Sequence, residues 1–153
     1  MKQLAIETDK LNSTIQIVYV DSLSDMPKLY SFYLRENANL IDNGHAYPII
    51  THNDTDHAIV ALQDDNILGF ILFNYGGPAN LAKLGWIVMS AVDERYRSRG
   101  IFTILNKHFE DLCKNNGCNT ISSLVHKNNK VRLASAEKVG LKPTFKYLMK
   151  RLH

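Results

Sequence analysis

Short stretches of alternating or β-branched apolar residues recur along this chain. Residues 14–20 are rich in isoleucine and valine between polar neighbours, which predicts a strand. The same pattern at 57–63 and 67–75, with a polar turn between them, predicts a hairpin. Glycines and a proline at 76–78 predict a reversal, and a long strand is expected at 81–92.

Other stretches place apolar residues three or four positions apart, as an α-helix does. Between Ser24, a candidate cap, and Gly44 this spacing predicts one helix or two short ones. Residues 100–116 share an apolar face up to the stop at Gly117. A further helix is expected at 129–139, where a glycine again follows.

The remaining apolar stretches, 119–126 and 144–152, read as strands, the second from its alternation. The predicted order is therefore β-α-β-β-β-α-β-α-β. This order is typical of an α/β chain with one mixed sheet covered by helices. Because no linker or repeat interrupts it, we expect a single domain over residues 1–153, with its core at about 14–152.

Composition narrows the class of protein. The chain is 45% hydrophobic and 22% charged, with a net charge of +3. No apolar run approaches the ~20 residues that span a membrane, and the N-terminal residues do not resemble a secretory signal. Cys113 and Cys118 lack the spacing of a metal site, so we expect reduced thiols, a cytoplasmic protein and no metal. The basic residues are spread along the chain, which argues against nucleic acid as a partner; a homodimer stays open.

The stretch RYRSRGIF, residues 95–102, joins the long strand to the most regular helix. The start of a helix exposes unpaired N–H groups and the positive end of the helix dipole, which together suit an anion. Gly100 allows a ligand to approach the backbone closely, and Arg97 and Arg99 add cationic donors. A phosphate site is consistent with this pattern, as is a charged turn that only begins a helix.

The longer stretch VDERYRSRGIF resembles the pyrophosphate loop of the GCN5-related N-acetyltransferases (the GNAT superfamily). Val92, Arg97 and Gly100 match the valine, the arginine and the first glycine of the family motif. Glu94 stands where the family usually has proline, and Phe102 stands where it keeps a second glycine or an alanine.

A second stretch, NKVRLASAEKVGL at 129–141, is similar to another signature of the same family. The matching residues are Asn129, Glu137, Lys138 and Gly140, with Leu141 in place of phenylalanine. Two motifs in this order and at this separation imply a GNAT-like (acyl-CoA N-acyltransferase) fold.

The resemblance implies that acetyl-CoA lies between two splayed parallel strands. Backbone groups around Ser90 and Val92 would then bind the pantetheine arm, and Asn129 would lie near it. The resemblance assigns the pyrophosphate to the loop residues Arg97, Ser98, Arg99, Gly100, Ile101 and Phe102.

Acetyl transfer to an amine needs a base for the amine, a polarised thioester carbonyl and an acid for the leaving thiolate. Many family members supply the acid from a tyrosine, and Ala136 stands at that position here. His126, at the end of its predicted strand, is the candidate base because histidine titrates near neutral pH. We assign Ser90 to the positioning of a water, and an exposed loop histidine is the competing interpretation of His126.

Two functions follow from these residues. The leading one is an acetyl-CoA-dependent N-acetyltransferase, an acyltransferase that acts on a primary amine. The alternative is a catalytically inactive protein of the same fold, a binding or structural module such as a viral particle contains. The acceptor stays open among an amino acid, a polyamine, a small drug, a protein amine and a charged tRNA. Tyr30, Tyr33 and Tyr47 are candidates to line its pocket, although helical spacing favours the core for the first two.

Overall fold

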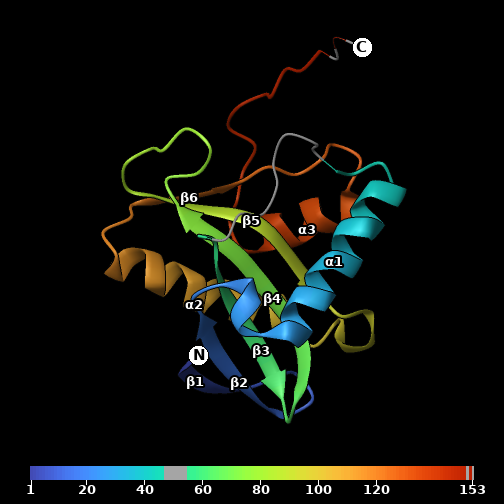
Figure 1. The fold of residues 1–153 in the computed structure, drawn as a ribbon, viewed down its shortest axis with the longest axis vertical. Coiled ribbons are helices and arrows are strands. Elements are labelled where there is room, and N and C mark those ends of the chain that lie inside the picture. The colour runs from blue at the N-terminus through green and yellow to red at the C-terminus, as the bar shows by residue number, and fades with distance from the viewer. Residues whose placement is uncertain (47–54, 151, 153) are drawn as a thin grey trace.

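A mixed sheet with helices on both faces forms the body of the protein (Figure 1). The structure is a computed structural model that describes residues 1–46, 55–150 and 152. Its six strands lie in sequence order: β1 (Lys2–Thr8), β2 (Thr14–Val20), β3 (His57–Gln63), β4 (Asn66–Tyr75), β5 (Leu84–Val92) and β6 (Thr120–Ser123). The helices are α1 (Pro27–Asp42), α2 (Ile101–Asn115) and α3 (Lys130–Lys138), with 3₁₀ turns at Leu23–Asp25 and Glu94–Tyr96.

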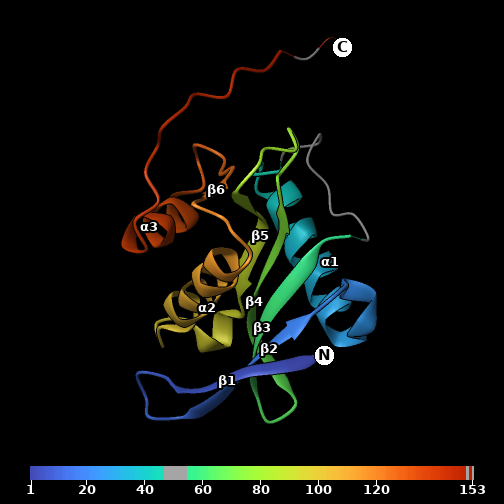
Figure 2. The same ribbon diagram turned by 90° about the vertical axis from the view of Figure 1, so that its left-hand side faces the viewer.

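Neighbouring strands from β1 to β5 pair antiparallel, whereas β5 and β6 pair parallel. α1 covers one face of the sheet and α2 the other, with α3 beside α2 (Figure 2). Alternate residues of the central strands therefore enter two separate cores. Phe70 packs with the α1 side and Phe73 with the α2 side, and both are fully buried. Burial of each such side chain stabilises the fold by about 1.5–3 kcal/mol.

Most predicted elements form where the pattern placed them. β2 and β3 have the predicted bounds, β4 begins one residue early, and α2 and α3 lie within their predicted ranges. β5 begins at Leu84 rather than at 81, and β6 ends at Ser123 rather than at 126. No helix among the described residues has the length and apolar content needed to cross a membrane.

The start of α1 differs from the prediction. Ser24 caps nothing; instead, Ser22 accepts a hydrogen bond from the Ser24 N–H at the start of the short 3₁₀ turn. α1 then begins at Pro27, whose fixed φ suits the first turn of a helix. It continues as one helix of 16 residues, not as two short ones.

The sheet also begins earlier than predicted: the sequence pattern did not indicate β1, at Lys2–Thr8. β1 is an edge strand that alternates polar residues with Leu4 and Ile6, and Ile6 is 62% exposed. β1 pairs with β2 on one side only, and it buries few of its side chains. Its apolar pattern is therefore too weak to predict a strand. The sheet therefore begins before position 14, and Leu4 and Ala5 of β1 pack, partly buried, against the core.

The prediction of a last strand at 144–152 is wrong: among the residues that the structure describes there, none belongs to a strand. Residues 144–150 and 152 belong to no strand, and Phe145 and Leu148 are 94% and 88% exposed. Alternation shows that a segment can serve as a strand, but a strand also needs a neighbour with free N–H and C=O groups. The chain runs away from the sheet after α3, so this segment has no such neighbour (Figure 2).

The contact between α2 and β5 depends on a glycine. A Cβ on Gly85 would overlap the sulfur of Cys113 and lie 3.3 Å from Cζ of Phe109, both of which belong to α2. Cys113 and Phe109 are buried, so neither can move far. The missing side chain of Gly85 thus sets how closely α2 approaches the strand that borders the site described below.

We expect Gly85→Ala to lower the free energy of unfolding by about 1–3 kcal/mol, because it overpacks this contact. Urea denaturation measures the change. Cys113→Ala removes the sulfur that the new methyl group meets, so the double variant should recover part of the loss. Strictly additive effects of the two substitutions would contradict the proposed overlap.

Candidate active site

β5 and β6 separate before β5 ends. Their parallel pairing stops at Ile87 and Ser123, whereas β5 stays paired with β4 as far as Val92. Residues 88–92 therefore have a partner strand on one side only, among the residues that the structure describes. The unpaired N–H and C=O groups on the other side can bind an extended ligand as a further strand would.

A cleft of about 1070 Å³ begins at this open edge. Its walls come from the second half of α1, the end of β5, the turn into α2, the residues after β6, and α3. Nine predicted site residues line it: Ser90, Val92, Arg97, Ser98, Gly100, Ile101, Phe102, His126 and Asn129. The structure thus brings together residues that lie far apart in the sequence.

The turn from β5 into α2 leaves donors free at the cleft. Ser98 and Gly100 both have positive φ values, 65° and 79°, which reverse the chain sharply. α2 then begins without a side-chain cap. Because no side chain satisfies the first N–H groups of α2, they and the helix dipole favour an anion there.

The arginines of this turn have different roles. Arg97 lines the cleft and donates from Nε to the Val92 carbonyl at 3.3 Å. Arg99, also predicted to hold phosphate, does not line the cleft among its described residues. Its guanidinium forms a buried ion pair with Asp9 and donates to Oε1 of Gln63 at 3.1 Å. The expectation for the Arg99 side chain is therefore corrected: it ties the β1–β2 turn to the start of α2.

His126 lies in the cleft, with its ring centroid 5.7 Å from that of His45. Its Nδ1 accepts a hydrogen bond from the Asn128 N–H at 3.1 Å. With this bond in place, the neutral ring carries its proton on Nε2. To accept a proton at Nδ1 it would have to break the bond to Asn128, so this geometry favours His126 as a donor; its role as base stays a prediction.

The first turn of α3 is held by its own side chains. Asn129 caps the helix and accepts from the Arg132 N–H at 3.2 Å. Ser135 donates to the Arg132 carbonyl at 2.9 Å, which occupies its hydroxyl hydrogen. Ala136 is buried and is not among the cleft residues. Neither Ser135 nor Ala136 offers an acid to the cleft.

Glu36 and Arg132 are two of the charged cleft residues that the sequence analysis did not predict. Glu36, in α1, is the one carboxylate among the described residues that line the cleft. Arg132, in α3, also lines it. Neither belongs to a matched motif position, and only the packing of α1 and α3 brings them to β5. Tyr30 and Tyr33 do not line the cleft, and Tyr47 lies outside the described residues.

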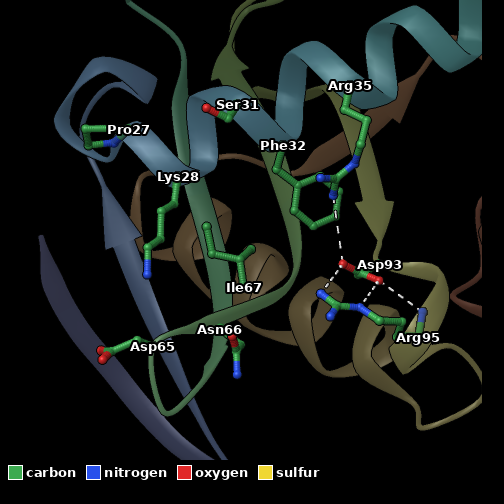
Figure 3. Close-up of a pocket in the computed structure, with 10 residues that line it drawn as sticks. All are labelled: Pro27, Lys28, Ser31, Phe32, Arg35, Asp65, Asn66, Ile67, Asp93 and Arg95. Carbon is green, nitrogen blue, oxygen red and sulfur yellow. Dashed lines mark hydrogen bonds and ion pairs between the residues drawn. The ribbon is translucent and has the colours of Figure 1, made fainter.

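A smaller hollow of about 430 Å³ lies against α1 and the β3–β4 turn (Figure 3). Asp93 borders it and accepts bonds from the backbone N–H, Nε and Nη2 of Arg95 at 3.0–3.2 Å. Arg35 of α1 lies 3.8 Å from the same carboxylate and stacks on Phe32. These contacts fix the residue that follows the open edge of β5. The hydrogen bonds from Arg95 lower the pKa of Asp93 below its ordinary value.

The mixed sheet places an open strand edge beside an uncapped helix start, and comparison with known proteins identifies the family. Residues 19–141 match the model of the acetyltransferase (GNAT) family. The chain belongs to this family.

One curated relative is N-alpha-acetyltransferase 30 of Schizosaccharomyces pombe. It is 25% identical over 115 residues, which cover 71% of this chain and 77% of that protein. The sequence similarity extends over most of both chains.

Solved structures share the fold. An aminoglycoside acetyltransferase from an uncultured soil metagenomic sample, in complex with sisomicin, has a TM-score of 0.69 and 17% identity, over 91% of this chain and 97% of that one. A ribosomal-protein-alanine N-acetyltransferase from Brucella melitensis biovar Abortus 2308 has a TM-score of 0.69 and 16% identity, over 90% and 99%. An aminoglycoside N-acetyltransferase in complex with CoA has a TM-score of 0.61 and 18% identity, over 90% and 98%.

We expect the Asp93 contacts to make stability depend on acid. Because the folded-state pKa of Asp93 is lowered, its contribution is present above the ordinary aspartate pKa of about 3.9 and is lost as pH falls through the lower, folded value. Asp93→Asn keeps an oxygen for the Arg95 N–H but removes the charge. Urea titrations at about pH 7, 5 and 3 should show a smaller acid loss for this variant than for the wild type. Asp111→Asn, at an exposed site on α2, is the control; equal acid losses in all three proteins would refute the prediction.

Proposed function

We propose that the protein is an N-acetyltransferase that moves the acetyl group of acetyl-CoA to a primary amine. The observation that carries this proposal is the unpaired edge of β5 beside the uncapped start of α2, within one cleft. The two features suit the two ends of one ligand: a pantetheine arm that pairs as a strand, and a diphosphate that needs N–H donors. Family membership supports acetyl transfer in general.

Acetyl-CoA would supply an activated acyl group as a thioester. Backbone groups of residues 88–92 would hold the pantetheine arm, and an N–H near Val92 would polarise the carbonyl. The N–H groups between Arg97 and Phe102 would take the diphosphate, with Gly100 leaving room for it. Asn129 contributes by capping α3, which forms the facing wall.

The amine would enter from the α1 side of the cleft. A protonated amine is attracted to a carboxylate, and Glu36 is the one carboxylate among the described lining residues. The amine must then lose its proton before it attacks. His126 and Ser90 stay the candidates for proton transfer, directly or through water; as a donor at Nε2, His126 would instead assist the departing thiolate.

The buried Ala136 leaves the thiolate without the acid that many family members use. A thiol has an ordinary pKa of ~8.5, so its thiolate can leave near neutral pH. A positioned acid accelerates such a step by about 10²–10⁴-fold. We therefore expect slow turnover, with the departing thiolate taking its proton from water or from the attacking amine.

No single residue of the cleft identifies the acceptor amine. By their names, the relatives given above are an N-alpha-acetyltransferase, a ribosomal-protein-alanine N-acetyltransferase and aminoglycoside acetyltransferases. A panel of acceptors, comprising a peptide with a free N-terminus, sisomicin and a polyamine, covers these classes and one more.

The test of CoA binding uses two glycines at the two ends of α2. Gly100 lines the cleft, whereas Gly117 is exposed beyond the other end; both have positive φ, 79° and 82°. Gly100→Glu should abolish CoA binding through bulk and like charge, and Gly117→Glu should bear a similar backbone strain and keep it. Calorimetry measures affinity, and the wild type should gain about 2.7 kcal/mol of stability at a hundredfold excess of CoA over Kd.

Two results would refute the proposal. A wild type without a melting shift at millimolar CoA favours the inactive alternative. A folded Gly100→Glu protein with unchanged affinity means that the turn only begins a helix.

We expect Glu36→Gln to raise KM for the amine while leaving KM for acetyl-CoA unchanged. Loss of one charge-assisted hydrogen bond corresponds to about 10–100-fold in amine affinity. Steady-state assays of thiol release with the acceptor panel measure both constants. Asp42→Asn, at an exposed position of the same helix and outside the cleft lining, should change neither. An unchanged KM for every acetylated amine would exclude Glu36 from acceptor binding.

A further inference from the structure

Arg132, in α3, lines the cleft and is largely withdrawn from solvent. Nη1 donates to Ser135 Oγ at 3.3 Å, but Nη2 is buried and has no hydrogen-bond partner among the described residues. Burial lowers the pKa of Arg132 to about 10, so the group is still charged at neutral pH. The structure therefore holds a buried cation with an unused donor in the wall of the cleft.

Such an arrangement is costly in the free protein. A buried charge needs an opposite charge, and a buried donor without a partner destabilises the fold. No ion pair of Arg132 occurs within the described part of the chain. Lys10, Arg97 and Lys138 also line the cleft, whereas Glu36 is the one acidic residue among its described lining. The cleft thus has an excess of positive charge that a ligand with negative charge would balance.

The ring of Phe102 explains how the guanidinium is held. The Arg132 guanidinium carbon lies 4.8 Å from the ring centroid, within the range of a cation–π contact. Phe102 belongs to the first turn of α2, where the backbone N–H groups have no cap. Phe102 is also the position where the family motif has a small residue. The bulky ring therefore places a guanidinium fork beside the start of the helix.

We propose that Arg132, stacked on Phe102, donates to the diphosphate of a CoA thioester and supplements the N–H groups at the start of α2. This inference rests on the proposed function, since it assigns part of the same cleft. A guanidinium fork suits a phosphate because two parallel N–H donors match two phosphate oxygens. Arg132 is thus a ligand-binding residue of this chain, outside the family motif positions that matched.

The experiment compares three ligands by calorimetry: CoA, inorganic pyrophosphate, and pantetheine, which has no phosphate. Arg132→Gln should weaken CoA and pyrophosphate by about 10–100-fold and leave pantetheine unchanged. Lys130→Gln removes the same charge from an exposed site on α3 outside the cleft lining, and should change each affinity less than about threefold.

Two further measurements separate binding from folding. Melting temperatures of the free proteins show whether Arg132→Gln is folded. Arg132→Lys keeps the charge and the aliphatic stem, and serves if the glutamine variant fails to fold. It should bind CoA more weakly than the wild type, because an ammonium group cannot make the paired contact, while its affinity for pantetheine stays the same.

The outcomes distinguish this inference from the proposed function. Suppose that the wild type binds CoA. If the Arg132 variants bind CoA equally well, or if their affinity for pantetheine falls as much as their affinity for CoA, the inference is overturned and the proposed function stands. If pyrophosphate binds through Arg132 but CoA does not bind, the anion contact stands and the proposed function falls. If the wild type binds neither ligand, both are overturned.

Discussion

The end of pairing between β5 and β6 is the constraint on which the site depends. Parallel strands that stay paired leave no free backbone groups, and these two part at Ile87 and Ser123. β4 continues to pair with β5 as far as Val92, so the exposed edge belongs to a strand held on its other side. An edge fixed in this way can bind a ligand without paying the entropy of ordering itself.

The salt bridges around this edge divide the arginines into two groups. Arg99 and Arg95 are occupied by Asp9 and Asp93, which anchor the turn between β5 and α2. Arg97 and Arg132 lack a carboxylate partner among the described residues and line the cleft. The carboxylates thus give the turn its shape, and the arginines they leave free give the cleft its charge.

The local part of the site could be predicted from the sequence. A strand, a basic turn with a glycine, and a regular helix predict an anion site at the start of α2, and the same stretch resembles the family motif. The roles of individual arginines could not be read there, because Arg97 and Arg99 are two residues apart and equally basic. Asp9, which takes the side chain of Arg99, comes from the β1–β2 turn ninety positions away.

Periodicity determined which segments became the central strands and helices, since each buries an apolar face that repeats at two or about 3.6 residues. It did not determine that 144–152 would stay unpaired, since pairing requires a free neighbouring edge. Tertiary structure alone placed Glu36 and Arg132 in one cleft with Ser90. It also left Nη2 of Arg132 without a partner. The physical reason is that the charge and burial of a site depend on which helices and strands pack together there. The local sequence pattern does not determine that packing.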